Sequence, residues 1–278
     1  MRKTRDYFGN LRKAKMILSD FHTHSTFSTD GTQALEDMAR SAVKCGLKTI
    51  CFTEHNDFDY PDGEFLLDAD AYKNELFRVR EELSGKIEVL FGVELGLMKH
   101  LGKRLREYVD GRGFDFVIGS SHLIDGKDPY FPEYFEELGQ RNGILRYFES
   151  IVENIGAFSD FDVYGHLDYA VRYSPEKCYN PVDFREVIDE ILRKIVGLGK
   201  GIEINTAGLR KGLSHANPHP FILKRYRELG GEIITVGSDA HNSADIAADF
   251  DAAESFLQGA GFEFYTVFRG RKPYFVKF

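Results

Sequence analysis

Seven short apolar runs, spread along most of the chain, constrain the fold more than any other feature of the sequence. Each run is rich in Val, Ile and Phe, and its apolar residues are nearly continuous instead of alternating with polar ones. Such runs are typical of strands buried on both faces, as in a parallel sheet covered by helices. The sequence therefore predicts seven strands, within residues 16–21, 49–53, 87–93, 114–119, 161–165, 201–205 and 232–237.

Segments with helical spacing lie between these predicted strands. One of them places Leu35, Met38 and Ala42 on a single helical face, and residues 184–195 repeat the pattern. Each such helix would cover a strand. Glycine readily adopts the left-handed conformation that ends a helix, and glycines stand where these helices should stop, at Gly46, Gly85, Gly199, Gly230 and Gly231.

Strands that alternate with helices imply a parallel sheet, and a chain of 278 residues suits one barrel. The predicted fold class is α/β, as a single-domain distorted TIM-like (β/α)7 barrel. An open, doubly wound sheet is the alternative. We expect one domain over residues 1–278, with residues 1–16 as a basic N-terminal extension and residues 262–278 as a terminal strand and turn.

The composition argues against several classes of function. Lys and Arg number 36 against 44 Asp and Glu, which gives a formal net charge of -8, and no basic stripe runs along the chain. Nucleic-acid binders ordinarily carry such a stripe, so we expect a small-molecule substrate and no nucleic acid. No run approaches the roughly 20 apolar residues of a membrane span. The sequence thus predicts no membrane association.

The cysteines and the start of the chain bear on localisation. Three cysteines form an odd set without C-x-x-C spacing, which argues against a disulfide framework and for a reducing compartment. The first residues are basic but lack the apolar core and cleavage site of a secretory signal. We therefore expect a cytoplasmic protein.

Every predicted strand ends in a residue that can bind a metal ion. After the first strand, His22 and His24 stand two apart on extended chain, so both imidazoles point the same way. The C-terminal ends of barrel strands converge on one face, where active sites of this architecture lie. The later strands supply Glu54 and His55, Glu94, His122, His166 and Asp168, Glu203 and Asn205, and Asp239 and His241.

These motifs resemble the polymerase-and-histidinol-phosphatase (PHP) superfamily, and within it the histidinol-phosphate phosphatases. The resemblance runs from Asp20 to His241, and Arg172 together with the segment from Asn205 to Lys211 favours the phosphatase branch. The motifs, in order, are Asp-Phe-His-Thr-His, Thr-Glu-His, Gly-Val-Glu, Gly-Ser-Ser-His, Gly-His-Leu-Asp, Glu-Ile-Asn-Thr-Ala-Gly-Leu-Arg-Lys and Gly-Ser-Asp-Ala-His.

The resemblance implies three divalent metal ions. Asp30 occupies a position where many relatives carry histidine. Imidazole and carboxylate ligands together suit zinc, iron or manganese, and the sequence does not choose among them. The first site would use His22, His24, Glu94 and Asp239, the second Glu94, His122 and His166, and the third Asp30, His55 and His241.

The resemblance also implies hydrolysis of L-histidinol phosphate to L-histidinol and phosphate, a step of histidine biosynthesis. Three divalent ions would outweigh the carboxylates that bind them, attract the phosphate and make a bridging hydroxide available as the nucleophile. Arg172, with Arg210 or Lys211, would bind phosphate oxygens. Asp239, His241 or a metal-bound water would protonate the leaving oxygen.

Further contacts are expected around this site. Glu54 and Glu203 would orient metal-bound imidazoles. Asp168 would either do the same or contact a substrate amine, and His219 would contact the substrate. Four aromatic residues could form the wall of the pocket: Phe58, Tyr60, Tyr169 and Tyr173.

Two other functions remain open at this point. One is a PHP-type phosphoesterase that acts on nucleotides or oligonucleotide ends, although the acidic charge disfavours long nucleic acids. The other is a binding module with a structural metal cluster, which the full set of ligands disfavours.

Overall fold

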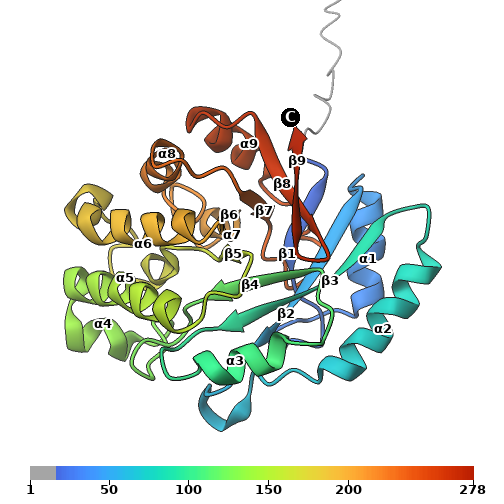
Figure 1. Cartoon of the computed structure of the whole chain (residues 1–278), viewed down its shortest axis with the longest axis horizontal. Coiled ribbons are helices and arrows are strands. Elements are labelled where there is room, and N and C mark those ends of the chain that lie inside the picture. Colours follow the sequence, from blue (N-terminus) through green and yellow to red (C-terminus); the bar gives the residue numbers. More distant parts are fainter. Residues whose placement is uncertain (1–16) are drawn as a thin grey trace, which may run out of the picture.

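The computed structural model describes residues 17–278, so the predicted extension over residues 1–16 lies outside the described residues. Seven parallel strands form one sheet in which spatial order equals chain order. Figure 1 shows these strands at the centre of the molecule with helices around them. The strands are β1 (Ser19–Thr23), β2 (Thr49–Asn56), β3 (Glu88–Gly96), β4 (Phe116–Ser120), β5 (Val163–Tyr164), β6 (Gly201–Asn205) and β7 (Ile234–Gly237).

The helices turn apolar faces toward the strands, as the spacing predicts. In α1 the buried residues include Leu35, Met38 and Ala42, and Gly46 and Gly199 follow their helices with positive φ angles of 81° and 67°. Within residues 17–278, no helix combines the length and the apolar character needed to cross a bilayer. The helices are α1 (Leu35–Lys44), α2 (Ala69–Glu82), α3 (Gly102–Val109), α4 (Pro132–Leu138), α5 (Gln140–Ala157), α6 (Arg185–Gly197), α7 (Ala207–Arg210), α8 (Pro220–Glu228) and α9 (Phe250–Gly259), with short 3-10 turns at Pro61–Gly63, Tyr169–Tyr173 and Pro181–Phe184.

Residues beyond the ends of β1 and β7 bring the sheet back on itself. Thr23 forms a parallel bridge with Ala240. The His24 amide donates to the Ala240 carbonyl at 2.9 Å, and the Asp239 amide donates to the His22 carbonyl at 2.7 Å. A doubly wound sheet would reverse its strand order, which this sheet does not. The predicted seven-stranded, nearly closed barrel is therefore confirmed.

One extra residue in β1 allows two successive side chains to point into the barrel. Asp20 pairs with Ile50 but Thr23 pairs with Phe52, so β1 contains one residue more than β2 between these pairs. Successive residues of a regular strand point to opposite faces, and a bulge re-aims them. This irregularity allows the Phe21 ring to lie 5.2 Å from the Phe116 ring. The neighbouring His22 side chain faces the ends of strands across the barrel.

A β-hairpin covers the N-terminal end of the barrel. It consists of β8 (Phe264–Arg269) and β9 (Lys272–Lys277), in agreement with the predicted strand and turn. The buried Phe268 ring lies 5.0 Å from Phe116, and the Ile234 amide at the start of β7 donates to the Thr266 hydroxyl at 3.1 Å. The Phe116 and Phe268 rings thus pack at the N-terminal end of the barrel, opposite the strand ends that carry the expected metal ligands.

Candidate metal centre

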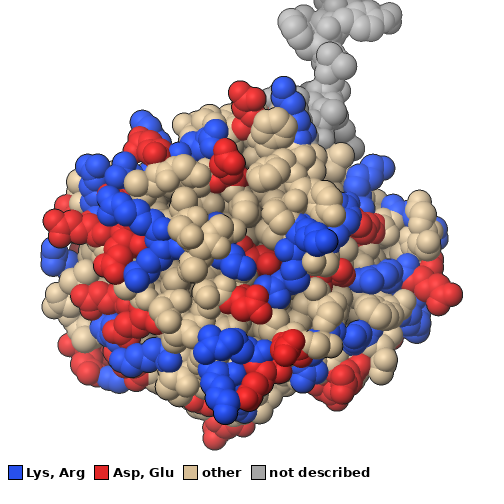
Figure 2. Space-filling view, in the orientation of Figure 1, with Lys and Arg blue, Asp and Glu red and all other residues tan. Residues whose placement is uncertain are grey.

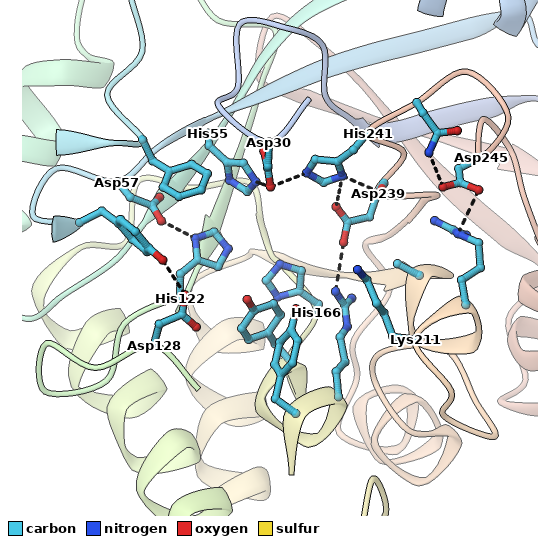
Figure 3. A pocket seen from close by; sticks show the side chains of 18 residues that line it. Asp30, His55, Asp57, His122, Asp128, His166, Lys211, Asp239, His241 and Asp245 are labelled. Carbon is cyan, nitrogen blue, oxygen red and sulfur yellow. Dashed lines mark hydrogen bonds and ion pairs between the residues drawn. The ribbon is translucent and has the colours of Figure 1, made fainter. Parts of the chain in front are cut away.

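The C-terminal ends of the strands surround a cavity of about 520 Å³, shown from close by in Figure 3. The nine side chains expected to bind metal all lie at this end of the barrel. Each brings a ring nitrogen or carboxylate oxygen to within 3.5 Å of that of another. The nine are His22, His24, Asp30, His55, Glu94, His122, His166, Asp239 and His241.

The first expected ligand group has the spacing of atoms that share an ion. His22 Nε2 lies 3.1 Å from Glu94 Oε2 and 3.6 Å from Asp239 Oδ1. His24 Nε2 lies 3.6 Å and 3.5 Å from the same two oxygens. Ligands about 2.1 Å from a tetrahedral ion lie roughly 3.4 Å from one another. Most of these separations exceed a hydrogen bond and fit shared coordination.

Glu94 stands between the first two groups. Its Oε2 atom faces His22 and His24 and also lies 3.0 Å from His55 Nδ1. Its Oε1 atom lies 3.3 Å from His122 Nε2 and 2.9 Å from His166 Nε2. Ser120 donates a hydrogen bond of 2.7 Å to Oε1. The Glu94 side chain is fully buried. It therefore presents one oxygen to each group, as a bridging carboxylate would.

The third group lies at the mouth of the cavity. Asp30 Oδ2 is 3.1 Å from His241 Nε2 and 3.7 Å from His55 Nε2. The Asp30 side chain is 45% exposed and that of His241 25%. We call Asp30, His55 and His241 the rim ligands, and His22, His24, Glu94, His122, His166 and Asp239 the deep ligands.

The protonation states of two deep ligands favour metal binding. Burial, with the neighbouring His55 and His241, lowers the pKa of His24 well below its ordinary value, so the ring is neutral. Its buried Nε2 atom has no hydrogen-bond partner among the described residues, and such an atom is costly unless something binds it. Burial alone would raise the pKa of Glu94, but the surrounding imidazoles hold it well below its usual range. A divalent cation fits this set of donors.

Carboxylates behind the ligands fix the orientation of two imidazoles. Glu203 Oε2 lies 2.9 Å from His22 Nδ1, the orienting role expected for this residue. Glu54 acts one step further away, because it accepts from the Ser28 hydroxyl, which lies 3.1 Å from His24 Nδ1.

Asp57 is a functional residue that our sequence reasoning missed. Its Oδ2 atom lies 2.7 Å from His122 Nδ1, so it orients that imidazole as Glu203 orients His22. Asp57 follows His55 by two residues, just past the end of β2. The same i, i+2 argument that pairs His22 with His24 could have found it.

A buried carboxylate holds the loop that carries Asp239 and His241. Asp20 accepts hydrogen bonds from the Ser238 amide at 2.9 Å, the Ser238 hydroxyl at 2.6 Å and the Ala247 amide at 3.0 Å. Asp239 itself has a positive φ of 54°, a conformation that Asp tolerates better than most residues. Both ends of this loop are thereby tied to β1.

The three basic residues expected to bind phosphate all line the cavity, but their surroundings differ. Buried Arg172 donates to Asn217 Oδ1 at 2.7 Å, to Asn205 Oδ1 at 2.9 Å and to Asp239 Oδ2 at 3.2 Å. Arg210 donates to the Ser238 carbonyl and faces Asp245 at 3.6 Å. Exposed Lys211 has no acidic partner among the described residues. Within the described part of the chain, Lys211 is thus the one of these three cations that has no acidic partner.

His219 and Asp168 are placed away from the cavity lining. His219 caps α8, where its Nδ1 atom accepts from the Phe221 amide at 3.0 Å. Fully buried Asp168 accepts from Tyr179 at 2.9 Å, from the His219 amide at 2.9 Å and from Asn217. Both residues support the loop behind Arg172, and we assign neither to the substrate.

Three of the four aromatic residues expected in the pocket line it: Tyr60, Tyr169 and Tyr173. Phe58 instead packs against Tyr108, with ring centroids 5.3 Å apart. Phe65 lines the cavity in its place, with its ring 4.6 Å from that of Tyr60.

Comparisons with known proteins agree with this site. The sequence profile of the PHP domain matches residues 20–207. A histidinol-phosphatase of Lactococcus lactis is 33% identical over 91% of this chain and 95% of its own length. A probable histidinol-phosphatase of Clostridium acetobutylicum is 35% identical over 85% of this chain and 91% of its own length.

A solved structure resembles the whole described fold. Histidinol phosphate phosphatase from Lactococcus lactis, crystallised with zinc, L-histidinol and phosphate, superposes with a TM-score of 0.85 at 30% identity. The match covers 92% of this chain and 98% of the other. With the profile match over more than half of its residues, this chain belongs to the PHP domain family.

Proposed function

We propose that this chain is a metal-dependent phosphomonoesterase that hydrolyses L-histidinol phosphate to L-histidinol and phosphate. The observation that carries the proposal is the meeting of nine imidazole and carboxylate side chains, Glu94 among them, at a cavity that is also lined by Arg172 and Lys211. Relatives named histidinol-phosphatase, matched over nearly their whole length, support the choice of substrate.

Three ligand groups support three divalent ions. The Lactococcus lactis structure, which contains zinc, favours zinc, while the same donors also suit iron and manganese. Bound divalent ions neutralise phosphate charge and lower the pKa of water. The deep ligands would hold two of these ions and the rim ligands the third.

The basic residues of the chain would bind and orient the phosphate. Arg172 is fixed by Asn205 and Asn217, so its guanidinium is oriented before substrate arrives. Lys211, which lines the same cavity, would add a second cation. Asp239 and His241, which face each other at 3.7 Å, would hold a proton near the leaving oxygen. Tyr169 and Tyr173 would enclose the organic part.

A panel of phosphate esters tests this proposal. Metal-loaded protein should release phosphate from L-histidinol phosphate with a higher kcat/KM than from nucleoside monophosphates or short oligonucleotides. On the face drawn in Figure 2, Lys and Arg of the described chain are interspersed with Asp and Glu, which disfavours a nucleic-acid groove there. Efficient cleavage of another ester without cleavage of L-histidinol phosphate would refute the substrate assignment.

A further inference from the structure

Charge is divided across the cavity. Figure 3 shows Asp57 and Asp128 beside His122 on one side and Lys211 on the other, with His166 between them. A phosphate ester bound with its phosphate toward the basic side would extend its organic part toward Asp128. The two ends of such a substrate therefore meet side chains of opposite charge.

Asp128 differs from the other acids that line the cavity because no Lys, Arg or His among residues 17–278 pairs with it. Every other acid there faces a basic group of the protein. The pairs are Asp30 with His55 and His241, Asp57 with His122, Asp239 with Arg172, and Asp245 with Arg210.

Neutral groups hold the Asp128 carboxylate in place. The Tyr60 hydroxyl donates to Oδ2 at 3.0 Å, and the Tyr130 amide donates to Oδ1 at 2.8 Å. Asp128 is half-buried, and burial raises its pKa. A bound cation would compensate its charge. The carboxylate is therefore oriented, while no Lys, Arg or His side chain within residues 17–278 forms an ion pair with it.

The aromatic walls beside Asp128 suit a flat, cationic organic group. The Tyr60 ring meets Phe65 at 4.6 Å, and the rings of Tyr169 and Tyr173 lie 5.2 Å apart. All four line the same cavity as Asp128. Aromatic faces attract cations, and a nearby carboxylate adds direction through a charge-assisted hydrogen bond.

We propose that Asp128, oriented by Tyr60, is a specificity residue that binds a cationic nitrogen in the organic part of the substrate. The site would then favour phosphomonoesters of cationic alcohols over neutral esters of similar size. This inference rests on the proposed function, because L-histidinol carries both an amine and an imidazole. Either nitrogen provides the same chemistry, and the experiment distinguishes them.

The test compares Asp128→Asn with wild type on matched pairs of esters. For L-histidinol phosphate, kcat/KM should fall roughly 10- to 100-fold, mainly through KM, because a charge-assisted hydrogen bond is lost. For p-nitrophenyl phosphate it should change less than about 2-fold, since that ester offers no cation to Asp128. Tyr60→Phe should produce a smaller loss in the same direction. Asp125→Asn, an exposed residue near Asp128 that pairs with Arg146 outside the cavity, is the control.

One further ester identifies the nitrogen. If the amine is bound, the ester of 3-(imidazol-4-yl)propanol, which lacks it, should be insensitive to Asp128→Asn. If the imidazole is bound, this ester should remain sensitive. Equal losses on cationic and neutral esters, or no loss on any, would overturn the proposal, provided that metal content and thermal unfolding match wild type.

A pair without histidinol separates this inference from the proposed function. Wild type should prefer 2-aminopropyl phosphate over propyl phosphate, and Asp128→Asn should remove that preference if Asp128 binds the amine. If wild type does not cleave L-histidinol phosphate, the proposed function is refuted. The role of Asp128 would still be supported if wild type prefers the cationic ester and Asp128→Asn removes that preference.

Discussion

The deep and rim ligands belong to one centre but are held in different ways. Glu94 and His22 are fully buried at strand ends, and Glu203 hydrogen-bonds to the far nitrogen of His22. Asp30 stands in an exposed segment between β1 and α1, and its carboxylate faces the two rim imidazoles, those of His55 and His241. Preorganised ligands bind an ion without first being ordered, whereas exposed ones lose side-chain freedom on binding. We therefore expect the deep ligands to keep their metal under conditions that remove metal from the rim ligands.

The largest effect is expected from Glu94→Gln, which would break the deep part. The substitution keeps the size of the side chain but removes the charge shared by two ligand groups, so activity should fall at least ~1000-fold. Metal analysis should show the loss of at least one deep ion. Glu88→Gln, at the other end of the same strand, is the control. Unchanged metal content and activity in Glu94→Gln would contradict the bridging role.

Asp30→Asn should cause a smaller loss, confined to the rim. We expect activity to fall roughly 10- to 100-fold while the deep ions stay bound. Metal analysis after mild chelation should show about one ion fewer than in wild type. Asp30→His, which restores a ligand, should recover the missing ion. Loss of all metal from Asp30→Asn would show that the rim and deep parts bind as one unit.

Asp57→Asn tests how the orientation of a deep ligand affects its metal affinity. Its carboxylate orients His122 without reaching an expected ion, so metal affinity should fall about 10-fold with the fold intact. Competition with a chelator measures this change. An affinity equal to that of wild type would mean that the strands alone orient the imidazole.

The smallest effect is expected from breaking an ion pair in the helical layer. Its loss should change stability without changing metal binding. Hydrogen bonds from Arg225 lower the pKa of Asp189 below its ordinary 3.8. A lowered pKa in the folded state contributes stability above that ordinary value, and the contribution disappears as pH falls through the lowered pKa. At pH 7, Arg225→Gln should therefore unfold at a temperature a few degrees lower than wild type.

The same variant should differ less from wild type as the pH falls below 3.8. Metal-free samples followed by thermal unfolding give the comparison, and metal content at pH 7 should be unchanged. A difference between the two proteins that grows toward acid would contradict the sign of the argument.

Much of this molecule could be predicted from local patterns. The seven strands, the helices between them and their glycine stops each depend on a short stretch of sequence, and all are present within the described residues. Most of the expected ligands stand at predicted strand ends, which converge in any barrel, whereas Asp30 was implied only by the resemblance to the PHP superfamily. The role of Asp57 also had a local signal, although we did not use it.

Other features depend on contacts between distant segments. The bulge in β1, the anchoring of the Asp239 loop by Asp20, and the placement of His219 behind the site have no counterpart in spacing or composition. Nor does the sequence show that, within residues 17–278, Asp128 alone among the cavity acids has no basic partner, because pairing depends on distances between residues far apart in the chain.

The order of strands and helices follows from the sequence, since hydrophobic periodicity is a local property. The chemical types of the residues at the strand ends follow from it as well, because side-chain chemistry is also local. Only the tertiary structure decided which of those residues face one another, which are buried and which charge remains unpaired. The physical reason is that coordination, desolvation and ion pairing depend on distances of a few ångströms between atoms.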